Sequence, residues 1–210
     1  MTDELIFYTH PMSRGRIVRW MLEEIGRPYR TELLDFGTTM KAPAYLAVNP
    51  MGKVPAIRHG DTVVTEAAAI CAYLADAFPE AGLAPPPGDR LRGPYYRWLF
   101  FAAGPVEAAV SNKALGFVVP EGRQRMMGYG SFAEVLDVLD GAVSERDYLV
   151  GGRFTAADLY AGSQIGFGMQ FGTIEKRPAF ERYWSRIAAR PAALRAKAID
   201  DGAAPERPPA

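Results

Sequence analysis

The hydrophobic positions at the start of the chain follow first a strand-like and then a helical spacing. A β-prone run at residues 5–8 comes first. The apolar positions that follow at helical intervals are Ile17, Val18, Met21, Leu22 and Ile25. Gly26 and Pro28 are typical of a helix end. Residues 29–36 then alternate loosely and predict a second strand.

A second group of elements follows a loop or short helix over residues 37–52. Two β-prone runs, 54–58 and 62–65, are separated by a tight turn at 59–61. Residues 66–78 return to helical spacing. The order β-α-β, then β-β-α, predicts a mixed sheet covered by helices.

The pattern changes at Pro79, where a stretch rich in proline and glycine begins. Beyond it the spacing predicts only helices, near residues 91–117, 121–143, 155–171 and 178–190. We therefore expect an α/β domain followed by an all-α domain. The expected parts are an α/β domain at 1–80, a linker at 81–89, a helical domain at 90–200 and a loose tail at 201–210.

Composition narrows the possible partners. Lysine plus arginine and aspartate plus glutamate both number 24, so the net charge is zero and no general field attracts nucleic acid. No apolar run approaches the ~20 residues that span a membrane, and the N-terminus lacks a secretory signal, so we expect a cytoplasmic protein. One cysteine, Cys71, and two histidines lead us to expect no metal site.

Val54-Pro55 opens a predicted strand, although proline cannot donate to a central ladder. A cis bond would turn the Val54 backbone outward to pair with an extended peptide ligand. The alternative is a trans proline at a sheet edge.

The segment Thr65-Glu66-Ala67 joins a strand to a helix. The N–H groups at a helix start can bind a carboxylate, and Glu66 could hold an adjacent ammonium group. The alternative is that Thr65 or Glu66 only caps the helix.

Ser13 stands where the first helix begins, after His10 and Pro11. A hydroxyl there is commonly an N-cap, but a ligand thiol beside it would be favoured as thiolate by the helix dipole and a hydrogen bond. No Gly-x-Ser-x-Gly motif is present, which argues against a serine hydrolase. Thr155 and Asp158 form a capping-box pattern that predicts the start of a buried helix.

Several of these segments resemble the cytosolic glutathione transferases, specifically a serine-type, phi- or theta-like bacterial member. The matching segments are Phe7-Tyr8-x-x-Pro11-x-Ser13, Asn49-Pro50-x-Gly52-Lys53-Val54-Pro55, Glu66-Ala67-x-x-Ile70-x-x-Tyr73-Leu74 and the box from Thr155 to Asp158. The resemblance covers nearly the whole chain. It implies a thioredoxin-like first domain with a four-stranded sheet, glutathione as co-substrate, no metal and a homodimer.

The resemblance also implies roles for individual residues. Pro55 corresponds to the cis-proline, and Val54 pairs with the cysteinyl unit of glutathione. Glu66 and the N–H of Ala67 correspond to the binders of the γ-glutamyl group.

Further roles follow from the same resemblance. Lys41 and Lys53 match positions that reach the glycine carboxylate or the peptide backbone. Ser13 is the expected thiolate-stabilising group, with Tyr8 as its competitor, because other classes use a tyrosine of the first strand. Cys71 lies outside the turn that carries the reactive thiol of cysteine-type classes.

Two departures from the family pattern concern the expected site. Ala67 replaces a serine, and Met40 stands where related members often have histidine.

The leading hypothesis is attack of a glutathione thiolate on a hydrophobic electrophile, with detoxification as the general role. Alternatives are a glutathione-dependent isomerase, ether-cleaving or dehalogenating enzyme, or a non-catalytic binding or adaptor protein of the same fold.

Overall fold

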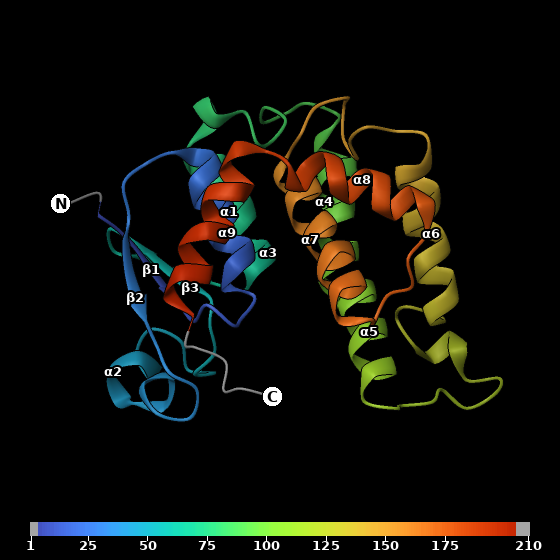
Figure 1. The fold of residues 1–210 in the computed structure, drawn as a ribbon, viewed down its shortest axis with the longest axis horizontal. Helices are drawn as coiled ribbons and strands as arrows, with labels where there is room; N and C mark the ends of the chain where they lie inside the picture. The colour runs from blue at the N-terminus through green and yellow to red at the C-terminus, as the bar shows by residue number, and fades with distance from the viewer. Residues whose placement is uncertain (1–3, 205–210) are drawn as a thin grey trace. The chain divides into compact units, whose positions relative to one another are not determined.

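The structure, a computed structural model, describes residues 4–204. Their contacts divide the chain into two compact units, which Figure 1 shows as ribbons. The first unit contains residues 4–81 together with 190–204, and the second contains residues 82–189.

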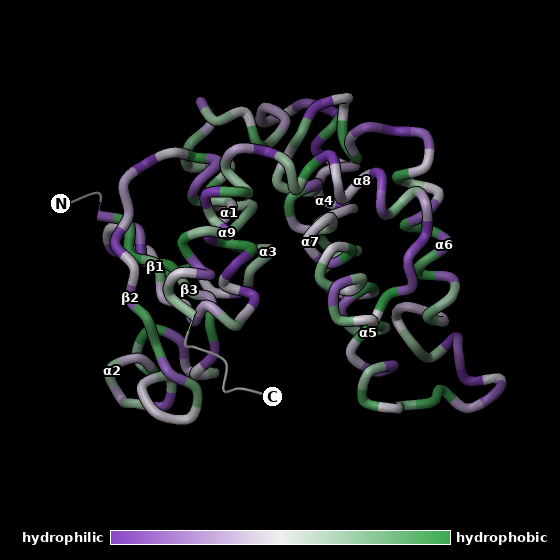
Figure 2. Tube along the Cα trace, viewed as in Figure 1, coloured by the Kyte–Doolittle hydropathy of each residue, from purple (hydrophilic) through white to green (hydrophobic). Residues whose placement is uncertain are grey.

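The first unit is built on a mixed four-stranded sheet, as the sequence predicts. Its strands are β1 (Leu5–Thr9), β2 (Arg30–Leu33), β3 (Ala56–His59) and β4 (Thr62–Thr65). The spatial order is β2-β1-β3-β4. The β1–β2 pair is parallel, and the β1–β3 and β3–β4 pairs are antiparallel. Figure 2 shows that β1 is mainly hydrophobic whereas β2 is more polar, consistent with a central and an edge strand.

Helices cover the sheet because alternate side chains of β1 and β3 point to opposite faces. The helices and short turns of this unit are α1 (Gly15–Ile25), η1 (Thr39–Lys41), α2 (Pro43–Leu46), α3 (Ala67–Ala77), η2 (Pro79–Ala81) and α9 (Pro191–Ala203). Helix α1 packs against both α3 and α9. A separate buried cluster of Met40, Tyr45 and Ala56 joins η1 and α2 to β3.

The predicted helix ends are confirmed at α1. Its apolar face is buried, and Gly26 ends it in the left-handed conformation, with φ 69°. The first of the two short strands begins at Ala56, two residues later than expected, because Pro55 precedes the ladder. Strand β2 is shorter than the predicted 29–36.

Helix α9 is the main difference from the expected domain organisation. The sequence assigns residues up to 200 to the helical domain, but α9 packs on α1 and belongs to the first unit. The buried guanidinium of Arg19 explains this: it lies 3.2 Å from Asp200 and also donates to Thr31 at 2.7 Å. The expected loose tail at 201–210 begins inside α9, and residues 205–210 of it lie outside the described residues.

The second unit is helical, as predicted. Its elements are α4 (Arg92–Phe101), η3 (Ala102–Val106), α5 (Glu107–Ala114), η4 (Gln124–Met126), α6 (Phe132–Ser144), α7 (Ala156–Phe171) and α8 (Pro178–Ala188). The π-helical turn η3 contains Pro105, which has no N–H for an α-helical bond. Helix α7 is buried on most sides and packs against α4 and α8.

The capping box at the start of α7 is confirmed. The Asp158 carboxylate accepts from the Thr155 N–H and hydroxyl, both at 2.9 Å, and from the Tyr183 hydroxyl at 2.8 Å. The predicted helix at 121–143 is wrong in its first part, since α6 begins only at Phe132. Within residues 4–204, no helix is both long and apolar enough to cross a membrane.

Candidate functional site

Three chain segments singled out in the sequence meet at one edge of the sheet. Tyr8 of β1 pairs with Ala56 of β3, and Ala56 pairs in turn with Thr65 of β4. The turn after β1, the residue before β3 and the residue after β4 therefore leave the sheet at the same edge. Because neighbouring strands lie about 4.8 Å apart, the three segments span roughly 10 Å across the sheet.

Ser13 is held within the turn between β1 and α1. Its hydroxyl donates to the His10 carbonyl at 2.6 Å and accepts from the Gly15 N–H at 2.9 Å. The residue is half-buried. Gly15 is required there because a Cβ on it would overlap the Thr9 hydroxyl. Ser13 lies one residue ahead of the N-cap Arg14, and its hydroxyl accepts from the first N–H of α1 at the positive end of the helix dipole.

The bond between Val54 and Pro55 is cis, as the family resemblance implies. Among residues 4–204, neither the N–H nor the C=O of Val54 has a hydrogen-bond partner. This backbone unit precedes β3 directly and remains available to pair with an extended ligand.

The loop before Val54 is fixed by buried side chains that the site prediction did not include. The Asn49 amide donates to the Lys53 carbonyl at 2.8 Å, and its oxygen accepts from the Met51 N–H at 3.1 Å. The Tyr45 hydroxyl donates to the same Lys53 carbonyl at 2.6 Å. Burial raises the pKa of Tyr45 to about 12, so the hydroxyl stays a donor at neutral pH. Asn49 could have been found from its place in the Asn-Pro-x-Gly motif, whereas Tyr45 carries no local signal.

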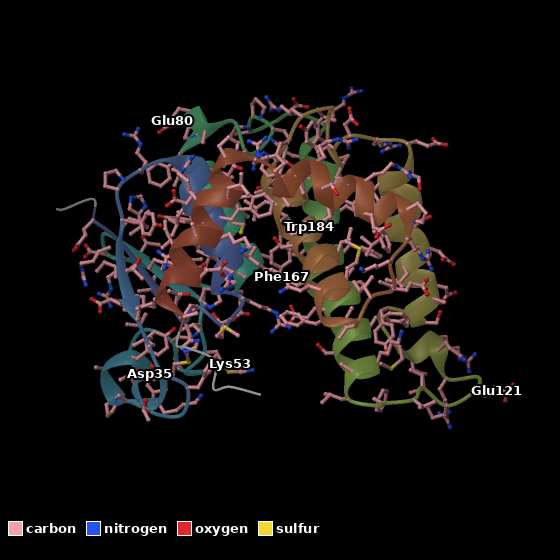
Figure 3. The ribbon with its side chains drawn as sticks, in the orientation of Figure 1. Asp35, Lys53, Glu80, Glu121, Phe167 and Trp184 are labelled. Atoms are coloured by element: carbon pink, nitrogen blue, oxygen red, sulfur yellow. The ribbon has the colours of Figure 1, made fainter. Side chains whose placement is uncertain are left out.

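The two candidate lysines differ in their surroundings. The Lys41 ammonium donates to the carbonyls of Gly52 at 2.7 Å and Met51 at 3.0 Å, which ties η1 to the loop. An ammonium has three donors, so one remains for a ligand. Lys53 is exposed, and Figure 3 labels its side chain. Within the described part of the chain, its ammonium has no hydrogen-bond partner.

Glu66 has an unusual backbone conformation at the start of α3. Its φ is 65°, and it is the non-glycine residue with positive φ among those described. Such conformations cost of order 1–3 kcal/mol and concentrate at functional sites. The side chain is exposed, and the first turn of α3 carries no acidic residue that would occupy its N–H groups. The segment therefore presents a carboxylate beside free helix N–H groups.

Three other residues considered in the sequence are packed inside the first unit. Tyr8 is half-buried with its ring centroid 5.5 Å from that of Tyr45, and Met40 is 3% exposed. Cys71 is fully buried, which raises the pKa of its thiol far above its usual range. Among residues 4–204, no three carboxylate, imidazole or thiol groups are placed to hold a metal ion.

The sheet order and the cis-proline before β3 define a thioredoxin-like domain, and a helical unit follows it in the chain. Sequence-family comparisons match residues 12–77 to "Glutathione S-transferase, N-terminal domain" and residues 129–191 to "Glutathione S-transferase, C-terminal domain".

Individual proteins agree with both matches. Glutathione S-transferase 3 of Zea mays is 29% identical over 90% of each chain. Glutathione S-transferase F9 of Arabidopsis thaliana is 30% identical over 72% of this chain and 76% of its own. The crystal structure of the glutathione transferase URE2P6 from Phanerochaete chrysosporium, in complex with oxidised glutathione, has a TM-score of 0.79 at 28% identity, covering 96% of this chain and 98% of that one. The chain therefore belongs to the glutathione S-transferase family, as its motifs indicate.

Proposed function

We propose that this protein binds glutathione at the sheet edge formed by the ends of β1 and β4 and the start of β3, and activates its thiol for attack on an electrophilic small molecule. The observation that carries the proposal is the register that aligns Tyr8, Ala56 and Thr65. It brings a hydroxyl at a helix start, an unpaired backbone unit and a carboxylate beside helix N–H groups to one edge.

Each of these groups matches one part of the tripeptide. The N–H and C=O of Val54, which have no partner among residues 4–204, would pair with the backbone of the cysteinyl unit in the manner of an added strand. Glu66 would attract the α-ammonium of the γ-glutamyl group, and the N–H of Ala67 would donate to its carboxylate. Lys41 and Lys53 would supply positive charge for the glycine carboxylate.

Ser13 would then stabilise the sulfur as thiolate. Its hydroxyl proton rotates from the His10 carbonyl toward the sulfur, and the α1 dipole favours the same negative charge. Lowering a thiol pKa by two units requires about 2.7 kcal/mol. A hydrogen bond to a charged group contributes about 1.5–3 kcal/mol and the dipole about 0.3–2 kcal/mol, so the required free energy lies within the range of the two together. The thiolate forms a bond to the electrophilic carbon as the leaving group departs with its electron pair, and the thiol proton passes to solvent.

The test compares Ser13→Ala with Tyr8→Phe. With glutathione and a chloroarene, we expect Ser13→Ala to lower kcat/KM by about 10- to 100-fold, corresponding to one charged hydrogen bond. Tyr8→Phe should retain near wild-type activity, because the Tyr8 ring packs against Tyr45. A larger loss in Tyr8→Phe would transfer the catalytic role to Tyr8. Calorimetry of the wild type with glutathione measures binding separately.

A non-catalytic adaptor is the second candidate. Ala67 has no hydroxyl to donate to the γ-glutamyl carboxylate, and Met40 is buried in the cluster with Tyr45 and Ala56. Both features predict modest glutathione affinity. No measurable binding of glutathione up to millimolar concentration would favour the adaptor, whereas binding without turnover of several electrophiles would favour a glutathione-binding module.

We also propose a cytoplasmic homodimer with a role in detoxification, as the family resemblance implies. Sedimentation at micromolar concentration tests the assembly: a 23.0 kDa species would contradict the dimer.

A further inference from the structure

An ion pair and a hydrogen bond, both made by Arg16, link helix α9 to the turn that carries Ser13. The Asp201 carboxylate of α9 accepts from Nη1 of Arg16 at 2.7 Å. Nε of the same guanidinium donates to the Pro11 carbonyl at 2.5 Å. One arginine therefore contacts α9 on one side and the turn on the other, and all of these residues lie in the first unit.

The Pro11 carbonyl belongs to the same planar peptide unit as the Met12 N–H. Arg16 holds the carbonyl end of this unit, and the Met12 N–H donates to Nδ1 of His10 at 3.0 Å. The Pro11–Met12 peptide, which lies one peptide unit ahead of the Met12–Ser13 bond, is thus held at both ends, and this restricts the path of the chain toward Ser13.

The position of Arg16 is unfavourable for the helix alone. Arg16 lies in the first turn of α1, where the helix dipole disfavours a cation, and that turn contains no acidic residue. The compensating anion comes from α9 instead. Asp201 is also paired with Lys197, and hydrogen bonds from Lys197 and Arg16 hold the pKa of its carboxyl below its usual value. The carboxylate consequently stays ionised at neutral pH.

We propose that Arg16 is a positioning residue for Ser13 and that Asp201 orients it, so that α9 takes part in setting the geometry of the thiolate-stabilising hydroxyl. This inference rests on the proposed function for its consequence in catalysis. Arg16 acts through the Pro11–Met12 peptide and contacts no reacting atom in this role.

The matched control is a second ion pair between the same two helices. Arg195 of α9 lies 3.1 Å from the Glu23 carboxylate and donates to the Glu23 carbonyl at 3.0 Å, at the other end of α1. Arg195→Ala therefore removes an α1–α9 contact without touching the Ser13 turn. Comparing it with Asp201→Asn separates turn positioning from helix docking.

In the kinetic test, Asp201→Asn should lower kcat with glutathione and a chloroarene by about three- to ten-fold, because misplaced catalytic groups lose rate. It should also raise the apparent pKa of the bound thiol, seen in the pH profile and the ultraviolet absorbance of the thiolate, with little change in the KM for glutathione. Asp201→Glu keeps the carboxylate and should retain the wild-type profile. Arg16→Lys should lose activity as Asp201→Asn does, since an ammonium cannot reproduce the two-sided guanidinium contact. A wild-type profile in Arg16→Lys, or a loss in Arg195→Ala equal to that in Asp201→Asn, would overturn the proposal.

Hydrogen exchange in the absence of ligand provides the second readout. We expect the Met12 amide to exchange about ten-fold faster in Asp201→Asn than in the wild type, while Arg195→Ala leaves it unchanged. An unchanged Met12 rate in Asp201→Asn would refute the positioning role even if the protein has no transferase activity. Absence of wild-type turnover with accelerated exchange would instead refute the proposed function and retain the positioning role.

Discussion

The hydroxyl of Ser13 donates its proton to the carbonyl oxygen of His10, at 2.6 Å, and so closes the turn in front of α1. The hydroxyl oxygen of Ser13 also accepts a hydrogen bond from the Gly15 N–H, at 2.9 Å. The side chain expected to stabilise a ligand sulfur therefore also stabilises the fold, and binding of a thiolate requires the proton to leave the His10 carbonyl.

This double role predicts a measurable effect of Ser13→Ala on stability. Losing the bond to the Gly15 N–H should lower the free energy of unfolding by about 1 kcal/mol, as for a typical intramolecular hydrogen bond. Urea denaturation measures this change. A loss of activity without any loss of stability would show that the bond contributes little.

Gly15→Ala should disrupt the approach of α1 to β1. The new Cβ would overlap the Thr9 hydroxyl, which is fully buried, so we expect a loss of about 1–3 kcal/mol in the free energy of unfolding. Gly141→Ala is the control, because Gly141 lies within α6 with open space around its Cβ position. That substitution should stabilise the protein by up to about 1 kcal/mol. Equal effects of the two changes would contradict the packing argument.

Two substitutions at Glu66 should separate backbone strain from charge. Glu66→Gly relieves the strain of a φ of 65° and should raise the free energy of unfolding by roughly 1 kcal/mol. Glu66→Ala keeps the strain and should leave stability nearly unchanged. Both remove the carboxylate and should weaken glutathione binding by about ten-fold or more, measured by calorimetry. Undiminished binding in both variants would exclude Glu66 from the site.

Cys71 should behave as a buried, neutral thiol. A thiol reagent should label it only after unfolding, because the side chain is fully buried and burial raises its pKa. Since the folded protein retains the proton while the unfolded chain loses it above a pKa of about 8.5, stability should fall by about 1.4 kcal/mol for each further pH unit. Cys71→Ala should lack this slope. Rapid labelling of the native protein would contradict the prediction.

The two capping boxes of the second unit should differ in their contribution. Asp158 accepts four hydrogen bonds in a buried position, from Leu149, Thr155 and Tyr183. Asp158→Asn turns an acceptor into a donor and should cost about 2–4 kcal/mol of unfolding free energy. Glu134→Gln in the exposed box with Ser131 should cost much less. Thermal unfolding distinguishes the two, and similar losses would refute the role of burial.

Local sequence determined much of the first unit and several contacts of the site. The helical spacing from Ile17 to Ile25 and the stop at Gly26 predicted α1, because both depend only on residues within one or two turns. Pro55 and Ser13 were recognised for the same reason, since each stands at the boundary of an element. Ser131 and Glu134 form an equally local capping box, although apolar spacing alone does not indicate it.

Only the tertiary structure decided which separated segments meet. The alignment of Tyr8, Ala56 and Thr65 is a matter of strand register, which depends on long-range pairing. Helix α9 joined the first unit because Asp200 and Asp201 pair with arginines of α1 more than 180 residues earlier. Sequence spacing contains no information on such ion pairs, since attraction between charges depends on their distance in space.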